Sequence, residues 1–350
     1  MFDLAKEARE QVAAASFDWR LLDGRSVLIT GATGLIGSAC VRMLLERNRL
    51  SAGNPIITWC LVRDEAKARQ VFSGYGPDDG LRFIEATVED VVWPEHQPLH
   101  YIIHAACPTA SRYFVEHPVE TADAIVLGTR NLLGIARKCG ALGFVYVSSM
   151  EAYGDGNEAP GLDHLLGESE VGYINPLSTR SCYSEGKRMA EQYCCDFASE
   201  YSVPAMVVRL AQTFGPGIPK DDSRLFAMCA RNALSGCDIV LKTTGESTRM
   251  YLYTADAVSA LFTVLLKGAP GEAYNAANPS TYSSVREMAE MVAGLLPGHT
   301  VSVRCELDLS APYPPQHHLP LDVSRLLALG WRPRLGLPEM YRNLIDYLRD

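Results

Sequence analysis

The sequence predicts an α/β fold in which a doubly wound parallel sheet is joined to a smaller C-terminal α/β lobe. Short apolar runs rich in β-branched residues alternate with amphipathic helical segments from about residue 26 to residue 210. This alternation indicates right-handed crossovers between parallel strands. After Pro216 the order changes to loops rich in glycine, serine and threonine. With 350 residues, 47% of them hydrophobic, the chain can bury a large core.

The order of elements also divides the chain. The segment after Pro216 predicts helices near 223–235 and 284–296, a capping box at Ser284 and Glu287, and proline-rich turns at 312–320. We expect an N-terminal helical extension, a nucleotide-binding domain and a substrate-binding lobe. The predicted ranges are residues 1–22 for the extension, 23–215 with 249–265 returning for the domain, and 216–248 with 266–350 for the lobe.

The first predicted strand leads into a glycine-rich turn. Gly31, Gly34 and Gly37 separate a short β-branched run from apolar residues at helical spacing. Gly31 suits a tight turn, Gly34 lets the backbone approach a pyrophosphate, and Gly37 lets helix and strand pack closely. The same glycines fit a purely structural turn, but here both flanking elements are present. The turn predicts a Rossmann-type dinucleotide site formed by Gly31, Thr33, Gly34, Leu35, Ile36 and Gly37.

The residues after the second predicted strand bear on which dinucleotide binds. An acidic residue there would bind the adenosine ribose 2′-hydroxyl, whereas an arginine would accommodate a 2′-phosphate. The strand at 56–62 is followed by Arg63 and then Asp64. Arg63 favours NADP and Asp64 favours NAD, so the sequence predicts NAD(P) with its phosphate state open.

Tyr183 and Lys187 lie four residues apart in a segment with a helical pattern. On a helix they share one face, so we expect Lys187 to stabilise the Tyr183 phenolate and lower its pKa from about 10. A tyrosine tuned in this way can take a proton from a sugar hydroxyl. A half-buried tyrosine beside a snorkelling lysine would show the same spacing, so the pair alone does not establish catalysis.

Further motifs continue along the chain. His104-Ala105-Ala106 ends an apolar run, and the predicted strand before residue 150 ends in Ser149, four residues before a Tyr-Gly pair. Together with the G-x-x-G-x-x-G spacing, these motifs resemble the extended short-chain dehydrogenase/reductase proteins of the NAD-dependent epimerase/dehydratase family over nearly the whole chain. Residues 108–118 and 180–191 are most similar to UDP-glucuronate decarboxylases, and next to dTDP-glucose 4,6-dehydratases.

The resemblance implies roles for individual residues. Ser149 would complete a triad with Tyr183 and Lys187, and the triad's tyrosine and lysine would also contact the cofactor. Arg249 would meet the diphosphate or a carboxylate, although an ion pair to Asp256 is an alternative. The implied site residues are Ser149, Glu151, Tyr183 and Lys187 for catalysis, Ala105 and Ala106 under the cofactor, and Pro108, Arg180, Gln212 and Arg249 around the substrate.

The resemblance also implies the chemistry, a transient oxidation of a nucleotide sugar at C4. A C6 carboxylate would then leave as carbon dioxide, whereas a C6 hydroxymethyl group would lead to loss of water. Dehydration needs an acid where this chain has Met150, and a thioether cannot donate a proton. C4 epimerisation, dehydration and a non-catalytic NAD(P)-binding role stay open. The redox-neutral chemistry of the resembling enzymes favours tightly bound NAD.

Composition limits the partners. A net charge of -9 argues against nucleic acid, and no apolar run has signal-peptide or transmembrane length, which predicts a cytoplasmic protein away from membranes. Ten cysteines without a C-x-x-C pair indicate free thiols, and eight histidines without metal spacing predict no metal.

Helices near 119–138 and 183–201 match a pair that forms a four-helix dimer interface in the resembling family, so we expect a homodimer.

Overall fold

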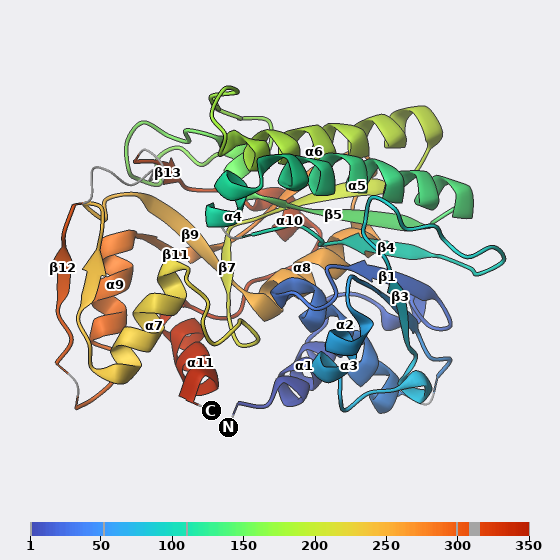
Figure 1. The fold of residues 1–350 in the computed structure, drawn as a ribbon, viewed down its shortest axis with the longest axis horizontal. Helices are drawn as coiled ribbons and strands as arrows, with labels where there is room; N and C mark the ends of the chain where they lie inside the picture. Colours follow the sequence, from blue (N-terminus) through green and yellow to red (C-terminus); the bar gives the residue numbers. More distant parts are fainter. Residues whose placement is uncertain (1, 52, 110, 299, 308–315, 350) are drawn as a thin grey trace.

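A seven-stranded parallel sheet organises the chain in the computed structural model (Figure 1), which confirms the predicted fold class. The structure describes residues 2–51, 53–109, 111–298, 300–307 and 316–349, so the first part of the proline-rich stretch at 312–320 lies outside the described residues. In spatial order the strands are β10 (Ala273–Ala276), β6 (Ala205–Leu210), β5 (Gly143–Ser149), β4 (Tyr101–His104), β1 (Ser26–Thr30), β2 (Ile57–Val62) and β3 (Leu81–Glu85).

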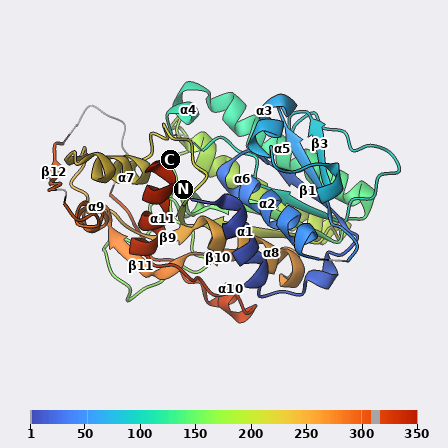
Figure 2. The same cartoon turned by 90° about the horizontal axis from the view of Figure 1, so that it is seen from below.

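Helices cover both faces of this sheet (Figures 1 and 2). The central strands are fully buried, as in β1 and β6, because a parallel sheet with helices on both sides has no face in water. One face carries α5 (Pro118–Cys139) and α6 (Ser181–Tyr201), which pack against each other. The other carries α2 (Leu35–Leu50) and α8 (Thr254–Lys267), while α3 (Glu65–Val71) connects β2 to β3.

The order of strands reverses direction between β1 and β4. Strands β2 and β3 follow on one side of β1, and β4, β5 and β6 follow on the other. The carboxyl ends of β1 and β4 at this switch point are the usual place for a ligand in a doubly wound sheet. The glycine-rich turn lies at this point.

A second region is built around β9 (Thr248–Tyr253), which pairs with β7 (Gln212–Phe214), β11 (Asn278–Ser284) and β13 (His318–Leu319). The predicted helices near 223–235 and 284–296 are confirmed as α7 (Leu225–Ser235) and α9 (Val285–Ala293), the latter with its capping box. The remaining elements here are β8 (Ile239–Leu241), β12 (Val303–Cys305) and α11 (Leu337–Arg349), whereas α10 (Ser324–Ala328) packs against β10 of the large sheet.

The division of the chain into lobes by residue range stays a prediction. Strand β10 falls within the range 266–350, but it pairs with β6 in the large sheet, and α8 packs on that sheet directly after β9. The N-terminal segment forms α1 (Leu4–Ala13), which packs against α2 and α8. The two chain ends lie close together in both views (Figures 1 and 2). Short helical turns occupy Trp19–Leu21, Pro77–Asp79, Ser111–Glu116 (α4) and Met150–Tyr153.

Candidate active site

Two of the three glycines in the turn after β1 are required by close backbone contacts. Gly31 has φ +63°, and a Cβ there would lie 2.8 Å from the carbonyl oxygen of Ala105 and from the Cα of Ala106. A Cβ on Gly37 would lie 2.2 Å from the carbonyl oxygen of Gly31. Both distances are far below van der Waals contact, so only glycine fits. The turn is thus held against the residues that follow β4.

Gly34 differs, because it is exposed and an added Cβ would meet only the Gly31 oxygen, at 3.2 Å. It is the N-cap of α2, so no side chain caps this helix. The first backbone N–H groups of a helix and its dipole favour an anion at this end. Thr33, Leu35 and Ile36 are partly exposed around the same turn. These residues fit the pyrophosphate of a dinucleotide.

A hydrogen-bonded histidine holds β1 and β4 together beneath the turn. His104 Nδ1 lies 2.8 Å from Thr30 Oγ1, and its Nε2 lies 3.1 Å from Thr129 Oγ1 on α5. The Ala106 N–H donates to Thr30 Oγ1 at 3.1 Å. Burial, followed by the charge of Lys187, lowers the pKa of His104 to about 3, so the ring is neutral. His104 therefore has a structural role, because it links β1 and β4 to α5 beneath the glycine turn. The sequence identifies His104 only as part of a motif.

Arg63 and Asp64 stand exposed directly after β2. Asp64 is the N-cap of α3, and its carboxylate accepts a hydrogen bond from the Lys67 N–H at 2.9 Å. The helix N-terminus therefore engages Asp64, whereas Arg63 occupies the first position after the strand. Arg63 and Asp64 predicted different cofactors. The capping contact distinguishes them, because Asp64 binds the N-terminus of α3 and Arg63 is the residue before this cap.

The predicted triad residues are brought together at the carboxyl end of β5. Ser149 ends the strand, and its side chain interacts with Tyr183 of α6 and acts to lower the pKa of that tyrosine. Lys187, one turn along α6, places its Nζ 5.6 Å from the Tyr183 ring centroid and donates to the Val147 carbonyl at 2.8 Å. The Tyr183 ring stacks on Phe114 of α4 at 4.4 Å between centroids. Tyr183 is 8% exposed and Lys187 is 3% exposed.

The expectation that Lys187 lowers the pKa of Tyr183 is wrong for these side chains. Burial raises the pKa of Tyr183, with further increases from Cys107 and Glu151, and the Ser149 hydrogen bond offsets only part of this. Burial likewise lowers the pKa of Lys187. Both groups are enclosed, so the cost of desolvating a phenolate exceeds the benefit of a cation several ångströms from the ring. A second cation beside Tyr183 would be needed to favour the phenolate.

Glu151 forms a two-pronged ion pair with Arg180. The terminal nitrogens of Arg180 donate to its two carboxylate oxygens at 3.1 and 3.2 Å, and the Ser184 hydroxyl lies 3.4 Å from one of them. Burial acts to raise the pKa of Glu151, but Arg180, His317 and Arg249 outweigh it and lower the pKa. Glu151 is therefore a carboxylate at neutral pH. Its partner is a residue that the sequence predicted as a substrate contact.

Arg249 and Gln212 lie on adjacent strands of the second region, since β9 and β7 pair with Gln212 opposite Tyr251. The Arg249 Nε is buried without a hydrogen-bond partner among the residues that the structure describes. The alternative ion pair to Asp256 is wrong, because Asp256 accepts from the backbone of Arg334 at 2.9 Å and from its side chain at 3.4 Å. Arg249 instead lies close enough to Glu151 to lower its pKa.

Other parts of the site frame these groups. Pro108 is partly buried two residues after Ala106, and its carbonyl accepts from the Cys107 thiol at 3.1 Å. Behind the triad, a buried ion pair joins Glu191 of α6 to Arg209 of β6 at 2.7 Å, and Ser148 of β5 donates to Glu191 at 2.5 Å. This pair, which sequence reasoning missed, fixes α6 on the sheet. A glutamate four residues after Lys187 was its only local signal.

Two further features bear on ligands and surroundings. Within the described ranges, no cluster of three or more histidine, cysteine, aspartate or glutamate side chains is placed to hold a metal ion. In the same ranges, no helix combines the length and the apolar character needed to cross a bilayer.

Comparison with known proteins gives the family. The model of the NAD dependent epimerase/dehydratase family matches residues 27–277. UDP-glucuronic acid decarboxylase 5 of Arabidopsis thaliana is 31% identical over 318 residues, which are 89% of this chain and 86% of that protein. UDP-glucuronic acid decarboxylase 1 of Xenopus tropicalis is 29% identical over 329 residues, which are 93% of this chain and 73% of that protein.

A solved structure supports the same fold. The UDP-glucuronic acid 4-epimerase of Bacillus cereus, in complex with UDP-glucuronic acid and NAD, superposes with a TM-score of 0.75 at 18% identity and covers 93% of this chain and 99% of that one. At this identity the likeness shows the fold, whereas the family match spans more than half of the chain. The chain is an enzyme that belongs to the NAD-dependent epimerase/dehydratase family.

Proposed function

We propose that this enzyme is a decarboxylase of the UDP-glucuronate type, which oxidises its nucleotide sugar transiently at C4. The observation that carries the proposal is the Arg249 guanidinium, whose buried Nε lacks a partner among the described side chains, beside the ionised Glu151 and the triad. A buried donor of this kind indicates a missing acceptor, and a sugar carboxylate or diphosphate supplies one. The relatives at about 30% identity are named for the same reaction.

The cofactor is proposed to be tightly bound NAD rather than NADP. Gly31, Gly34 and Gly37 would hold the pyrophosphate with Thr33, Leu35 and Ile36, Arg63 and Asp64 the adenosine ribose, and Ala105, Ala106, Tyr183 and Lys187 the nicotinamide end. When bound, the oxidised nicotinamide accepts a hydride, later returns it, and adds a positive charge that favours a phenolate nearby. Denaturing the purified protein and chromatographing the released nucleotide tests this: NAD supports the proposal, and NADP or no nucleotide contradicts it.

Tyr183 is proposed to remove the proton of the C4 hydroxyl, with Ser149 hydrogen-bonded to the same oxygen. The resulting C4 ketone is β to the C6 carboxylate, so the C5–C6 bond breaks, its electrons pass to the ketone, and carbon dioxide leaves. A solvent-derived proton then takes the place of the lost carboxylate on C5. Glu151, which is ionised, would accept hydrogen bonds from the substrate hydroxyls and relay that proton from solvent to C5. Met150 is buried in the apolar core and 6% exposed, and as a thioether it offers no acid for loss of water.

The substrate is proposed to lie between the carboxyl ends of β4 and β5 and the second region. Pro108 and Arg180 would contact it from the first side, and Gln212 and Arg249 from the second. A mass-spectrometric assay with UDP-glucuronate, UDP-glucose, UDP-GlcNAc and CDP-sugars tests the assignment. Loss of carbon dioxide from UDP-glucuronate supports it, whereas loss of water from a hexose, an isomer of unchanged mass, or no change with all four contradicts it.

We also propose a homodimer formed by α5 and α6 of two copies. These helices pack against each other, and they expose Val119, Leu127 and Met189, which are 66%, 50% and 40% exposed. Light scattering of the wild-type protein and of Leu127→Glu tests this. A monomeric mass for both proteins would contradict the proposal.

All ten cysteines are free thiols, which fits a reducing compartment and supports a cytoplasmic location. Cell fractionation tests that location.

A further inference from the structure

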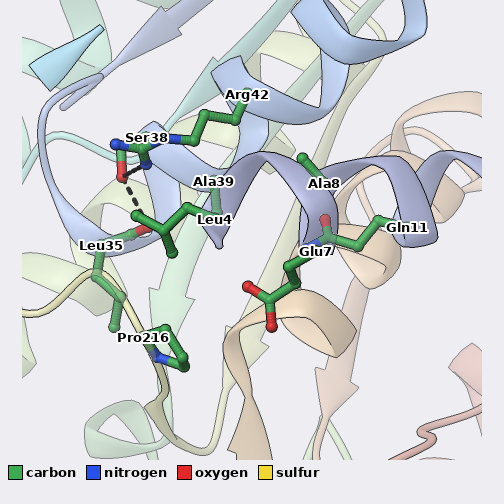
Figure 3. Close-up of a pocket in the computed structure, with 9 residues that line it drawn as sticks. All are labelled: Leu4, Glu7, Ala8, Gln11, Leu35, Ser38, Ala39, Arg42 and Pro216. Carbon is green, nitrogen blue, oxygen red and sulfur yellow. Dashed lines mark hydrogen bonds between the residues drawn. The ribbon is translucent and has the colours of Figure 1, made fainter. Parts of the chain in front are cut away.

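The N-terminal helix α1 connects the cofactor helix with the second region. Figure 3 shows Leu4, Glu7, Ala8 and Gln11 of α1 around a small pocket that faces the first turns of α2 and Pro216. Leu35, the first residue of α2, lines the pocket and also belongs to the glycine-rich turn. The helix therefore lies directly behind the residues that are proposed to hold the pyrophosphate.

Glu7 links α1 to the strand that carries Arg249. Its carboxyl group hydrogen-bonds the hydroxyl of Tyr253, the last residue of β9, which is 1% exposed. Asn343 of α11 donates to the same hydroxyl at 3.1 Å. Because that oxygen accepts from Asn343, it donates its own proton to Glu7. One carboxyl group thus joins three elements, α1, β9 and α11, and in Figure 3 it points away from α2 toward the second region.

Polar groups of α1 and α2 line the pocket beside Leu4 and Ala8. Gln11, 5% exposed, lines the same pocket one turn further on, and its Oε1 is buried without a hydrogen-bond partner among the described residues. On α2, Arg42 donates to Ser38 at 3.0 Å in the wall of the pocket. The packing of such a helix depends on the charge of each group. A low local dielectric strengthens each hydrogen bond and also raises the cost of each buried polar group without a partner.

The charge of Glu7 depends on pH in the physiological range. Burial raises its pKa to about 7, Tyr253 and Arg334 act to lower it, and Glu10 of α1 and Asp256 of α8 act to raise it. Arg42 of α2 also interacts electrostatically with Glu7, across the pocket. The folded pKa lies above the ordinary value of 4.5. The stabilising contribution is therefore complete below pH 4.5 and is lost as the pH rises through about 7.

We propose that Glu7 is a positioning residue that, through Tyr253, sets β9 and its Arg249 against the first turn of α2. It touches neither substrate nor cofactor, and it acts on the distance between the two halves of the site. Tyr253 and Arg249 share one strand, and Phe214 and Gln212 of β7 pair with it. The inference goes beyond the proposed reaction and does not depend on which sugar is bound.

Hydrogen–deuterium exchange, expressed as protection factors so that intrinsic rates cancel, tests it on the full chain from about pH 5 to about pH 9. In the wild-type protein, protection of α1, β9 and the first turn of α2 should fall together with a midpoint near pH 7. Glu7→Gln keeps an acceptor for Tyr253 without a charge, so its protection should stay at the low-pH level throughout. Glu10→Gln, on the exposed face of the same helix, keeps the titrating carboxyl group but removes a charge that raises the pKa of Glu7, so its midpoint should move to lower pH.

Two further measurements separate positioning from simple stabilisation. The affinity for NADH, measured by fluorescence titration of protein from which the bound nucleotide has been removed, should weaken over the same pH window in the wild type and stay constant in Glu7→Gln. Tyr253→Phe removes a hydrogen bond that lowers the pKa of Glu7, so its exchange midpoint should move to higher pH. The inference is overturned if Glu7→Gln keeps the wild-type midpoint, or if only α1 responds to pH. None of these readouts requires sugar turnover, so they stand apart from the proposed reaction.

Discussion

The cofactor side of the candidate site is formed by backbone, whereas the substrate side is formed by charged side chains from distant segments. On the cofactor side, other backbone atoms approach Gly31 and Gly37 so closely that a Cβ at either position would clash. On the second, Glu151 and Arg180 meet across 29 residues of sequence, and Arg249 approaches them from another sheet. The first side is fixed by local geometry, and the second by the balance of burial and charge.

This difference teaches how the two sides can change. A backbone cradle gives nearly the same contacts to every dinucleotide, so substitutions there destroy it or leave it intact. A cluster of charges can be retuned one residue at a time, because each pair contributes separately to the electrostatic balance. The substrate side is therefore where this chain can differ from its relatives, and Met150, at the position where dehydration needs an acid, is one such difference.

Tyr183→Phe should produce the largest effect and should divide the two sides most cleanly. Only the phenolic oxygen is lost, so turnover should fall by about a hundredfold to ten-thousandfold, while dinucleotide affinity, which the backbone of the glycine turn also supports, should fall far less. Steady-state kinetics and calorimetric titration of NAD measure the two quantities. Ser149→Ala should lose less, because it removes an orienting hydrogen bond and leaves the base. If affinity fell as far as turnover, the separation of the two sides would be refuted.

Gly37→Ala should have the next largest effect, on the backbone side. The new Cβ would lie 2.2 Å from the Gly31 oxygen, so the turn must move, at a cost of about 1–3 kcal/mol, and dinucleotide binding should weaken by at least about tenfold. Gly134→Ala is the matched control. A Cβ at this position in α5 meets nothing within 4 Å, so the variant should gain about 0.5–1 kcal/mol of stability. Thermal unfolding and NAD titration compare the two.

Arg180→Met should move the acidic limb of the pH–rate profile to higher pH. Burial raises the pKa of Glu151 and Arg180 is the largest opposing influence, so its loss lets burial dominate. Glu151 would then need a higher pH to ionise, and activity at acidic pH should fall first. Arg249→Met is the control, because it also removes one cation but leaves the Glu151–Arg180 pair intact. An equal shift in both variants would show that the pair has no special role.

Met150→Ala should have the smallest effect on turnover. The side chain is part of the apolar core, so the substitution should lower stability by about 2–5 kcal/mol and change the rate only through packing. Glu151→Gln, one residue later, should cost more activity and less stability. Chemical denaturation and initial-rate assays compare the two variants. If Met150→Ala lost more activity than Glu151→Gln, the assignment of the chemistry to Glu151 would be wrong.

Sequence reasoning succeeded where a feature depends on local spacing. The alternation of strands and helices, the glycine turn and the meeting of Ser149 with Tyr183 and Lys187 all follow from short patterns and motifs along the chain. Motif spacing carries this information because neighbouring residues on one strand or helix have a fixed relative geometry.

The failures concern contacts between distant segments. The pKa of Tyr183 was expected to be low, but burial against Phe114 and Cys107 cannot be inferred from the spacing to Lys187. The partner of Asp256 is Arg334 rather than Arg249, and the partner of Arg180 is Glu151. Each of these pairs depends on how the second region and the large sheet pack, which a local pattern does not encode.

The most direct test of the central claim uses UDP-glucuronate with deuterium in place of hydrogen at C4. Transient oxidation would remove that atom as hydride and return it to the same carbon, because a hydride held on carbon does not exchange with solvent. The account predicts that carbon dioxide is released and that the UDP-pentose product retains deuterium at C4, with one solvent-derived hydrogen at C5. Release of carbon dioxide with deuterium lost from C4, or recovery of the substrate without decarboxylation, would contradict it.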